Sequence, residues 1–253
     1  MALRILVESF WAIFGNIGQA FRVSILPLVV VNLCAFIMVS NLGTAEVSLG
    51  DLASLDITSL TLLLGLGLIA VCIFVMAWVA VAWHRLVLRE ERSGVLPITN
   101  GRSVWPYVGQ SVVIWLPTAL TAFVGLFALT FLVAVTLGPA STDRLGGILN
   151  TVSAVVCLYL WLRWGMALVG IAIEKPMGMR EAWRATRSLR STILGVAVLI
   201  VAVNRIAEQA ITAAGNAPQL VDLFFDASLG WITVMLGISV LTTLYGYCVE
   251  GRH

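Results

Sequence analysis

Charged side chains that could do chemistry are rare in this chain, and three of them interrupt long apolar stretches. They are Arg163, Arg205 and Glu208. If such stretches cross a membrane, an arginine at the centre of one costs roughly 2.5–3.5 kcal/mol to insert, so it needs a partner or a function. Arg205 and Glu208 are three residues apart and can pair on one helix face. Two interpretations of this candidate intramembrane polar site stay open: a site for a ligand, ion or proton, or structural pairs with Arg163 reaching toward the headgroups.

A second candidate is a run of arginines spaced by four, three and three residues, which predicts one basic face of a helix. Each cationic residue near an anionic leaflet contributes on the order of 1 kcal/mol of binding free energy. We interpret this set as a candidate contact for anionic lipid headgroups or for an acidic partner subunit; the alternative is that it only fixes the topology. The set consists of Arg180, Arg184, Arg187 and Arg190.

The other reactive side chains form no recognisable site. The four cysteines are Cys34, Cys72, Cys157 and Cys248, each alone in a different apolar stretch and without CxxC spacing. His84 stands alone after the apolar stretch that ends at residue 83, where we expect an interface residue. The sequence therefore predicts no catalytic, cofactor-binding or metal site, and a protein that is not an enzyme.

These residues must be positioned by membrane-spanning helices. The chain is 60% hydrophobic and 11% charged, with a mean hydropathy of +1.01, whereas soluble domains carry about a quarter charged residues. About 20 apolar residues suffice for a helix to cross a bilayer. We predict an all-α polytopic membrane protein that forms a single integral domain over 1–253, with an interfacial amphipathic helix over 1–22 and six spans at about 23–42, 59–83, 112–135, 149–173, 191–213 and 228–249.

The placement of basic residues predicts the orientation, because loops rich in lysine and arginine stay in the cytoplasm. With six spans, only Arg144 and Arg205 fall on the opposite side, and Arg163 lies within a span. Both termini are therefore expected in the cytoplasm. The residues on the cytoplasmic side are Arg4, Arg22, Arg85, Arg89, Arg92, Arg102, Lys175, Arg180, Arg184, Arg187, Arg190 and Arg252.

A weak threefold pattern accompanies the spans. A polar-aromatic segment on the cytoplasmic side precedes each odd-numbered span, and these segments contain Trp11, Trp105 and Trp183. The pattern is compatible with a pseudo-repeat of three hairpins, produced either by duplication or by shared physics alone.

Two segments carry a family resemblance. AWHRLVLREERSGVLP (82–97) and REAWRATR (180–187) resemble patterns in six-span bacterial inner-membrane proteins, which are loosely similar to the membrane domain of some glycerophosphodiester phosphodiesterases. The resemblance implies six spans and cytoplasmic termini. It implies no catalytic residue, because the phosphodiesterase site belongs to a soluble domain that this chain lacks.

The combined interpretation is a non-catalytic protein of the bacterial inner membrane. We expect an accessory, assembly or scaffold subunit that contacts anionic lipid headgroups and other integral membrane subunits. A net charge of +2 gives no reason to expect nucleic acid as a partner. The alternative is a transporter of a small solute or lipid that uses the polar residues within the bundle.

Overall fold

The computed structural model describes residues 1–42, 59–91, 103–214 and 219–251, and in this part of the chain every regular element is a helix. Arg92, Arg102 and Arg252 of the orientation argument lie outside it. The helices are α1 (Ala2–Phe14), α2 (Ile17–Leu42), α3 (Ser59–Arg89), α4 (Val104–Leu137), α5 (Pro139–Trp164), α6 (Met166–Ala172), α7 (Met179–Ala185), α8 (Arg190–Ala214) and α9 (Gln219–Cys248).

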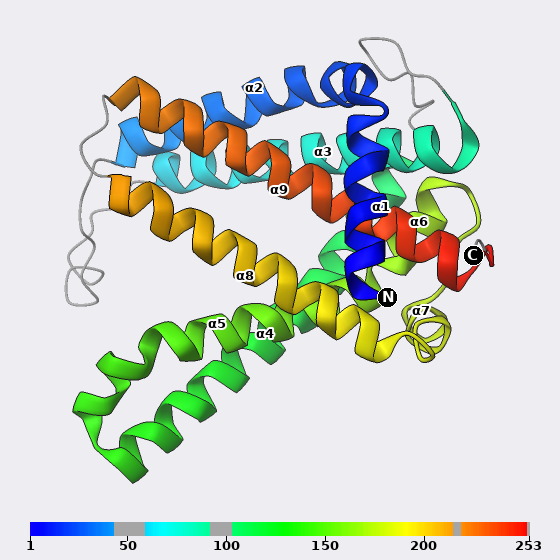
Figure 1. Cartoon of the computed structure of the whole chain (residues 1–253). Helices are drawn as coiled ribbons and strands as arrows, with labels where there is room; N and C mark the ends of the chain where they lie inside the picture. The colour runs from blue at the N-terminus through cyan, green and yellow to red at the C-terminus, as the bar shows by residue number, and fades with distance from the viewer. Residues whose placement is uncertain (43–58, 92–102, 215–218, 252–253) are drawn as a thin grey trace.

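Among the described residues, six helices are long and apolar enough to cross a membrane, which confirms the predicted all-α polytopic fold. Figure 1 shows α2, α3 and α9 running side by side and α8 packed on α5, with both termini toward one end. Most predicted spans overlap with the helical segments that are long and apolar enough to span a bilayer. These candidate spans are Ile17–Cys34, Gly65–Arg89, Val104–Leu137, Leu145–Ala172, Arg190–Ala210 and Ala227–Cys248.

The N-terminal helix is shorter than predicted. The chain turns at Gly15 and Asn16, so α1 ends at Phe14 and the first span begins at Ile17 rather than at 23. The face of α1 that carries Ile5 and Ile13 is buried, and α1 packs mainly on α9 and α8. An exposed apolar surface remains on α1, at Leu3, Val7, Phe10, Trp11 and Phe14.

The third span is one continuous helix, because α4 already begins at Val104 and continues through Pro117. The separate interfacial segment expected near Trp105 is therefore wrong. Gly138, with a φ of 86°, turns the chain directly into α5. The hairpin of α4 and α5 extends away from the other helices in Figure 1, and its aromatic side chains, such as Phe123 and Phe131, are exposed.

The fourth span is divided between two helices. Gly165 separates α5 from α6, and a Cβ at Gly165 would come within 2.9 Å of the Leu241 side chain on α9. Glycine therefore permits a close approach of the two helices. The short helix α6 is almost wholly buried, and Met166, Leu168 and Val169 belong to the core.

The hairpin pseudo-repeat stays a prediction. Helix α2 packs on α3 and α4 packs on α5, but α8 packs chiefly on α5, and α9 packs chiefly on α1 and α3. Separate surface helices precede α2 and α8, whereas the segment around Trp105 belongs to α4. The third unit thus differs from the first two in its packing, and the second unit differs from the other two in its preceding segment.

Candidate functional site

Arg163, in the last turn of α5, is the most deeply buried charged residue in the described part of the chain. The residue is only 4% exposed. Nε donates to the Thr186 hydroxyl at 3.0 Å, Nη1 donates to the Tyr159 hydroxyl at 3.1 Å, and Nη2 donates to the Trp183 carbonyl at 2.8 Å. The guanidinium carbon also lies 3.4 Å from the centre of the Trp183 ring. Edges and face of the guanidinium are therefore both used, in hydrogen bonds and in a cation–π contact.

These contacts hold α7 and the turn after it against the end of α5. Thr186 is buried and donates its own hydrogen to the Ala182 carbonyl at 3.0 Å, so its oxygen is free to accept from Arg163. Of the two interpretations of Arg163, the geometry agrees with a structural partner. The side chain does not reach into open solvent.

The structure does not join Arg163 to the other two residues of the predicted intramembrane polar site. Arg205 pairs with Glu208 along α8, with Nη1 and Oε2 3.0 Å apart, and the pair is partly exposed. The contacts of Arg163 go instead to α5, α7 and the turn after α7. The neighbouring Asn204 accepts from the Thr233 hydroxyl of α9 at 3.3 Å, which ties α8 to α9. The two groups form separate local arrangements.

The predicted basic face is divided by the fold. Helix α7 ends at Ala185, so Arg180 and Arg184 lie on α7, Arg187 lies in the turn, and Arg190 begins α8. The prediction of one continuous helical face is therefore wrong. The backbone N–H of Leu189 donates to the carbonyl of Thr186, which forms a turn between the two helices. All four arginines are exposed, and so is Lys175 in the preceding loop.

We call these five residues, Lys175, Arg180, Arg184, Arg187 and Arg190, the basic surface. Within the described residues none of them makes an ion pair with a carboxylate. The one acidic residue of α7, Glu181, accepts from the backbone N–H of Gly178 at 2.9 Å and caps the helix. The basic surface thus keeps its positive charge uncompensated by neighbouring side chains.

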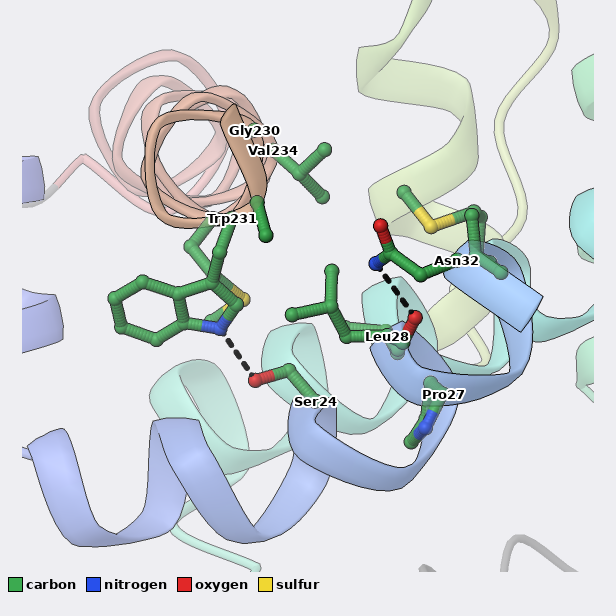
Figure 2. Close-up of a pocket in the computed structure, with 12 residues that line it drawn as sticks. Ser24, Pro27, Leu28, Asn32, Gly230, Trp231 and Val234 are labelled. Carbon is green, nitrogen blue, oxygen red and sulfur yellow. Dashed lines mark hydrogen bonds between the residues drawn. The ribbon is translucent and has the colours of Figure 1, made fainter. Parts of the chain in front are cut away.

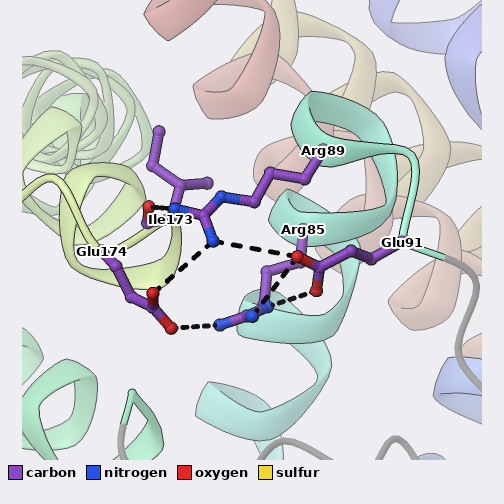
Figure 3. Close-up of polar contacts among 5 residues, drawn as sticks. All are labelled: Arg85, Arg89, Glu91, Ile173 and Glu174. Atoms are coloured by element: carbon purple, nitrogen blue, oxygen red, sulfur yellow. Dashed lines mark hydrogen bonds and ion pairs between the residues drawn. The ribbon is translucent and has the colours of Figure 1, made fainter.

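A second set of charges at the same end is fully paired, as Figure 3 shows. Arg85 contacts Glu91 through Nε at 2.8 Å and Glu174 through Nη1 at 3.0 Å. Arg89 lies 3.6 Å from Glu174 and donates to the Ile173 carbonyl. This network connects the end of α3 to the end of α6. The hydrogen bond and charge of Arg85 hold the pKa of Glu174 below its ordinary value of 4.5.

This network was not identified from the sequence. Glu90 has a φ of 57° and Glu174 a φ of 61°, in the left-handed region that few non-glycine residues adopt. These two turns direct Glu91 and Glu174 toward the arginines. Nothing in the spacing of the sequence indicates them.

His84 is buried, which corrects its expected place at the interface. Helix α3 continues to Arg89, so His84 lies more than a turn inside it. The Thr242 hydroxyl donates to the Ile238 carbonyl, so Nδ1 of His84 donates to Thr242 at 2.8 Å. Nε2 then accepts from the Tyr107 hydroxyl at 3.4 Å. The histidine links α3, α4 and α9 as a satisfied core residue.

A crevice of about 260 Å³ lies between α2, α3 and α9 (Figure 2). Its polar groups bond within its own walls: the Trp231 indole donates to the Ser24 hydroxyl at 2.7 Å, and the Asn32 amide donates to the Leu28 carbonyl at 2.9 Å. The remaining lining, such as Met76 and Val234, is apolar. The lining of this crevice is thus mostly apolar, like the surface of a helix in contact with lipid tails. None of the residues that line it is charged.

Comparison with protein-family models, curated proteins and solved structures gives no match to this chain. Among the described residues, no three histidine, cysteine or carboxylate side chains gather as a metal site would require. The most distinctive arrangement is therefore the basic surface with the buried arginine beneath it.

We expect Arg163→Gln to destabilise the protein by about 3 kcal/mol, because it removes both a charged hydrogen-bond set and a cation–π contact. Arg163→Lys retains the charge but loses the planar fork, and it is expected to recover less than half of that loss. Thermal unfolding in mild detergent measures both effects. The control is Arg22→Gln, which changes an exposed arginine on α2. Equal melting temperatures for the variants of Arg163 and Arg22 would contradict the assigned role.

The ion-pair network predicts a pH dependence. Because the folded-state pKa of Glu174 is lowered, its contribution to stability is complete above 4.5 and is lost as the pH falls through the folded-state value. Glu174→Gln is therefore expected to melt at a lower temperature than the wild type at pH 7, and the difference is expected to shrink in acid. The matched control is Glu90→Gln, which alters an exposed neighbour in the same run of charge. A difference that stays constant between neutral and acidic pH would refute the assignment.

Proposed function

We propose that this protein is a non-catalytic subunit of the bacterial inner membrane, where it acts as an accessory, assembly or scaffold protein. It rests on anionic lipid headgroups of the cytoplasmic leaflet through the basic surface and contacts other integral membrane subunits through its exposed apolar helices. The observation that carries the proposal is that the basic surface is exposed and unpaired within the described residues, while the segment that bears it is fixed by Arg163.

The rigid attachment supports a docking role. A flexible loop loses conformational entropy when it binds, whereas a segment that is already ordered keeps more of its binding free energy. Here Ala182 and Thr186 are buried and Arg163 holds the backbone of Trp183, so the arginines project from a fixed base. Each cationic residue contributes on the order of 1 kcal/mol near an anionic leaflet.

The cytoplasmic orientation is part of the proposal and comes from the charge distribution. Both chain ends, α7 and the network of Arg85 and Glu174 lie at one end of the helices (Figure 1). Basic residues concentrated at one end favour the cytoplasmic side. The bacterial inner membrane follows from the resemblance of 82–97 and 180–187 to six-span proteins of that membrane.

The α4–α5 hairpin supports contact with other membrane subunits. It projects from the bundle, and along its length α4 exposes large side chains that include Leu120, Phe123, Phe127 and Phe131. In a compact bundle, exposed apolar side chains of this kind contact lipid tails. In a projecting hairpin, two helix faces are also accessible to a helix of a neighbouring subunit. A transporter would instead need a polar cavity lined by Arg163 and Glu208, and neither residue lines the two crevices described in this molecule.

The lipid contact can be tested by replacing Arg180, Arg184, Arg187 and Arg190 together by Gln. After purification in mild detergent, the amount of phosphatidylglycerol that the variant retains is expected to be lower than that of the wild type by about tenfold or more. The reason is that four charges, each contributing about 1 kcal/mol, are removed. Native mass spectrometry counts the retained lipid. Replacement of the same four residues by Lys preserves charge and is expected to preserve retention. Equal retention by the Gln and Lys variants would reject the proposal.

The orientation predicts that Ser188, exposed in the turn after α7, faces the cytoplasm. A Ser188→Cys variant is expected to react with a membrane-impermeant maleimide in inside-out vesicles and to stay unlabelled in intact spheroplasts. The wild type serves as control for its own four cysteines. Labelling of Ser188→Cys in spheroplasts would reverse the proposed topology.

A further inference from the structure

A second crevice, of about 240 Å³, opens between α1, α3 and α9 at the end of the molecule where the chain termini lie. Its walls differ in character. Arg4 and Glu8 of α1 stand on one side, Val87 and Leu88 of α3 on the other, and Thr242 and Tyr247 of α9 contribute hydroxyl groups. An apolar wall therefore faces a wall that carries both signs of charge.

The two charges are fixed side by side. Nε of Arg4 donates to Oε1 of Glu8 at 2.8 Å, and the Tyr247 hydroxyl lies 2.9 and 2.7 Å from the two oxygens of the same carboxylate. Glu8 is thus held in place by α9. The Arg4 side chain is 64% exposed, and within the described residues its two terminal nitrogens have no hydrogen-bond partner. They remain available to an anion in the crevice.

The hydroxyl of Thr242 favours a ligand group of the opposite kind, a hydrogen-bond donor. Its hydrogen is donated to the Ile238 carbonyl, and it accepts from Nδ1 of the buried His84. A hydroxyl group has one hydrogen and two lone pairs. The hydrogen of Thr242 is already donated and one lone pair already accepts, so one lone pair remains available as an acceptor. Thr242 is 1% exposed and lines the crevice, so only a donor within the crevice can reach its oxygen. A cationic donor next to Glu8 lies within that crevice.

The depth of the crevice matches the headgroup layer. Val87 and Leu88 belong to the last turn of α3 and Tyr247 to the last turn of α9, so the crevice lies where two spans end. Helix α1 exposes Leu3, Phe10 and Trp11, an apolar surface typical of a helix at the membrane–water boundary. A ligand in this crevice therefore meets lipid on its apolar side.

We propose that this crevice binds one phospholipid whose headgroup joins a phosphate to a primary ammonium. The terminal nitrogens of Arg4 donate to the phosphate, the carboxylate of Glu8 and the oxygen of Thr242 accept from the ammonium, and Val87 and Leu88 contact the first methylenes of the acyl chains. The site is distinct from the basic surface: it is close to neutral, and it selects a zwitterion where the basic surface attracts anions.

The test uses the full-length protein in nanodiscs that contain equal amounts of phosphatidylethanolamine and phosphatidylcholine. Native mass spectrometry of the protein released in mild detergent counts the bound lipid of each kind. The wild type is expected to retain one phosphatidylethanolamine in preference to phosphatidylcholine by about tenfold, because a trimethylammonium group has no N–H to donate to Glu8. Equal retention of both lipids by the wild type would overturn the proposal.

Two variants separate the roles within the site. Arg4→Gln is expected to lower retention of both lipids by about tenfold, whereas Glu8→Gln is expected to abolish the preference for ethanolamine. Arg22→Gln, at an exposed arginine on α2, is the matched control and is expected to behave as the wild type. Equal loss from the Arg4 and Arg22 variants would overturn the proposal. Displacement of the lipid by soluble phosphoethanolamine at the same concentration would do so as well, because it would assign the crevice to a small zwitterion.

Discussion

Inside the hydrocarbon of a membrane no water is present to hydrogen-bond, so each polar group of a spanning helix must find its partner within the protein. Short side chains in this molecule meet that constraint on their own helix: Thr118, for example, donates to the carbonyl of Ile114. Several longer side chains, such as Arg163 and Arg85, also bond to neighbouring elements. Most of these contacts between helices occur toward the end of the molecule that carries both termini, where Arg163, His84 and Arg85 each join separate elements.

This concentration of polar contacts divides the molecule into two functional regions. At the terminal end, α1, α6 and α7 are held to the spans by hydrogen bonds and ion pairs, which fixes the surface that faces the headgroups. Away from that end the helices contact one another mainly through apolar side chains, and the α4–α5 hairpin diverges from the rest. Polar and apolar contacts between helices are thus separated along the length of the helices. For the proposed subunit, this separation keeps the lipid-binding surface rigid and leaves apolar helix faces to neighbouring helices.

The spans could be predicted from the sequence because insertion into lipid depends on summed hydropathy, which is a local property of the chain. The roles of individual polar residues could not. Whether Arg163 binds a ligand or a structural partner depends on where α7 packs, and that is a long-range property. His84 was misplaced because the helix end was set at the last apolar residue, whereas α3 continues to Arg89. The basic face was drawn as one helix because its spacing is helical, but spacing does not report the turn at Thr186.

A count of basic residues does not distinguish arginines that are paired with a carboxylate from arginines that are not. Arg85 and Arg89 are neutralised by Glu91 and Glu174, so these two arginines fix helices more than they attract anions. The basic surface has the same sign of charge and faces the same end of the molecule, yet it is uncompensated within the described residues. The electric field of the protein at an anionic leaflet comes mainly from such uncompensated charge. A close pair of opposite charges acts as a dipole, and the field of a dipole falls off faster with distance than the field of a single charge. In the proposed function, all of these arginines therefore contribute to the topology, whereas selective contact with anionic lipid is assigned to the few that the fold keeps unpaired.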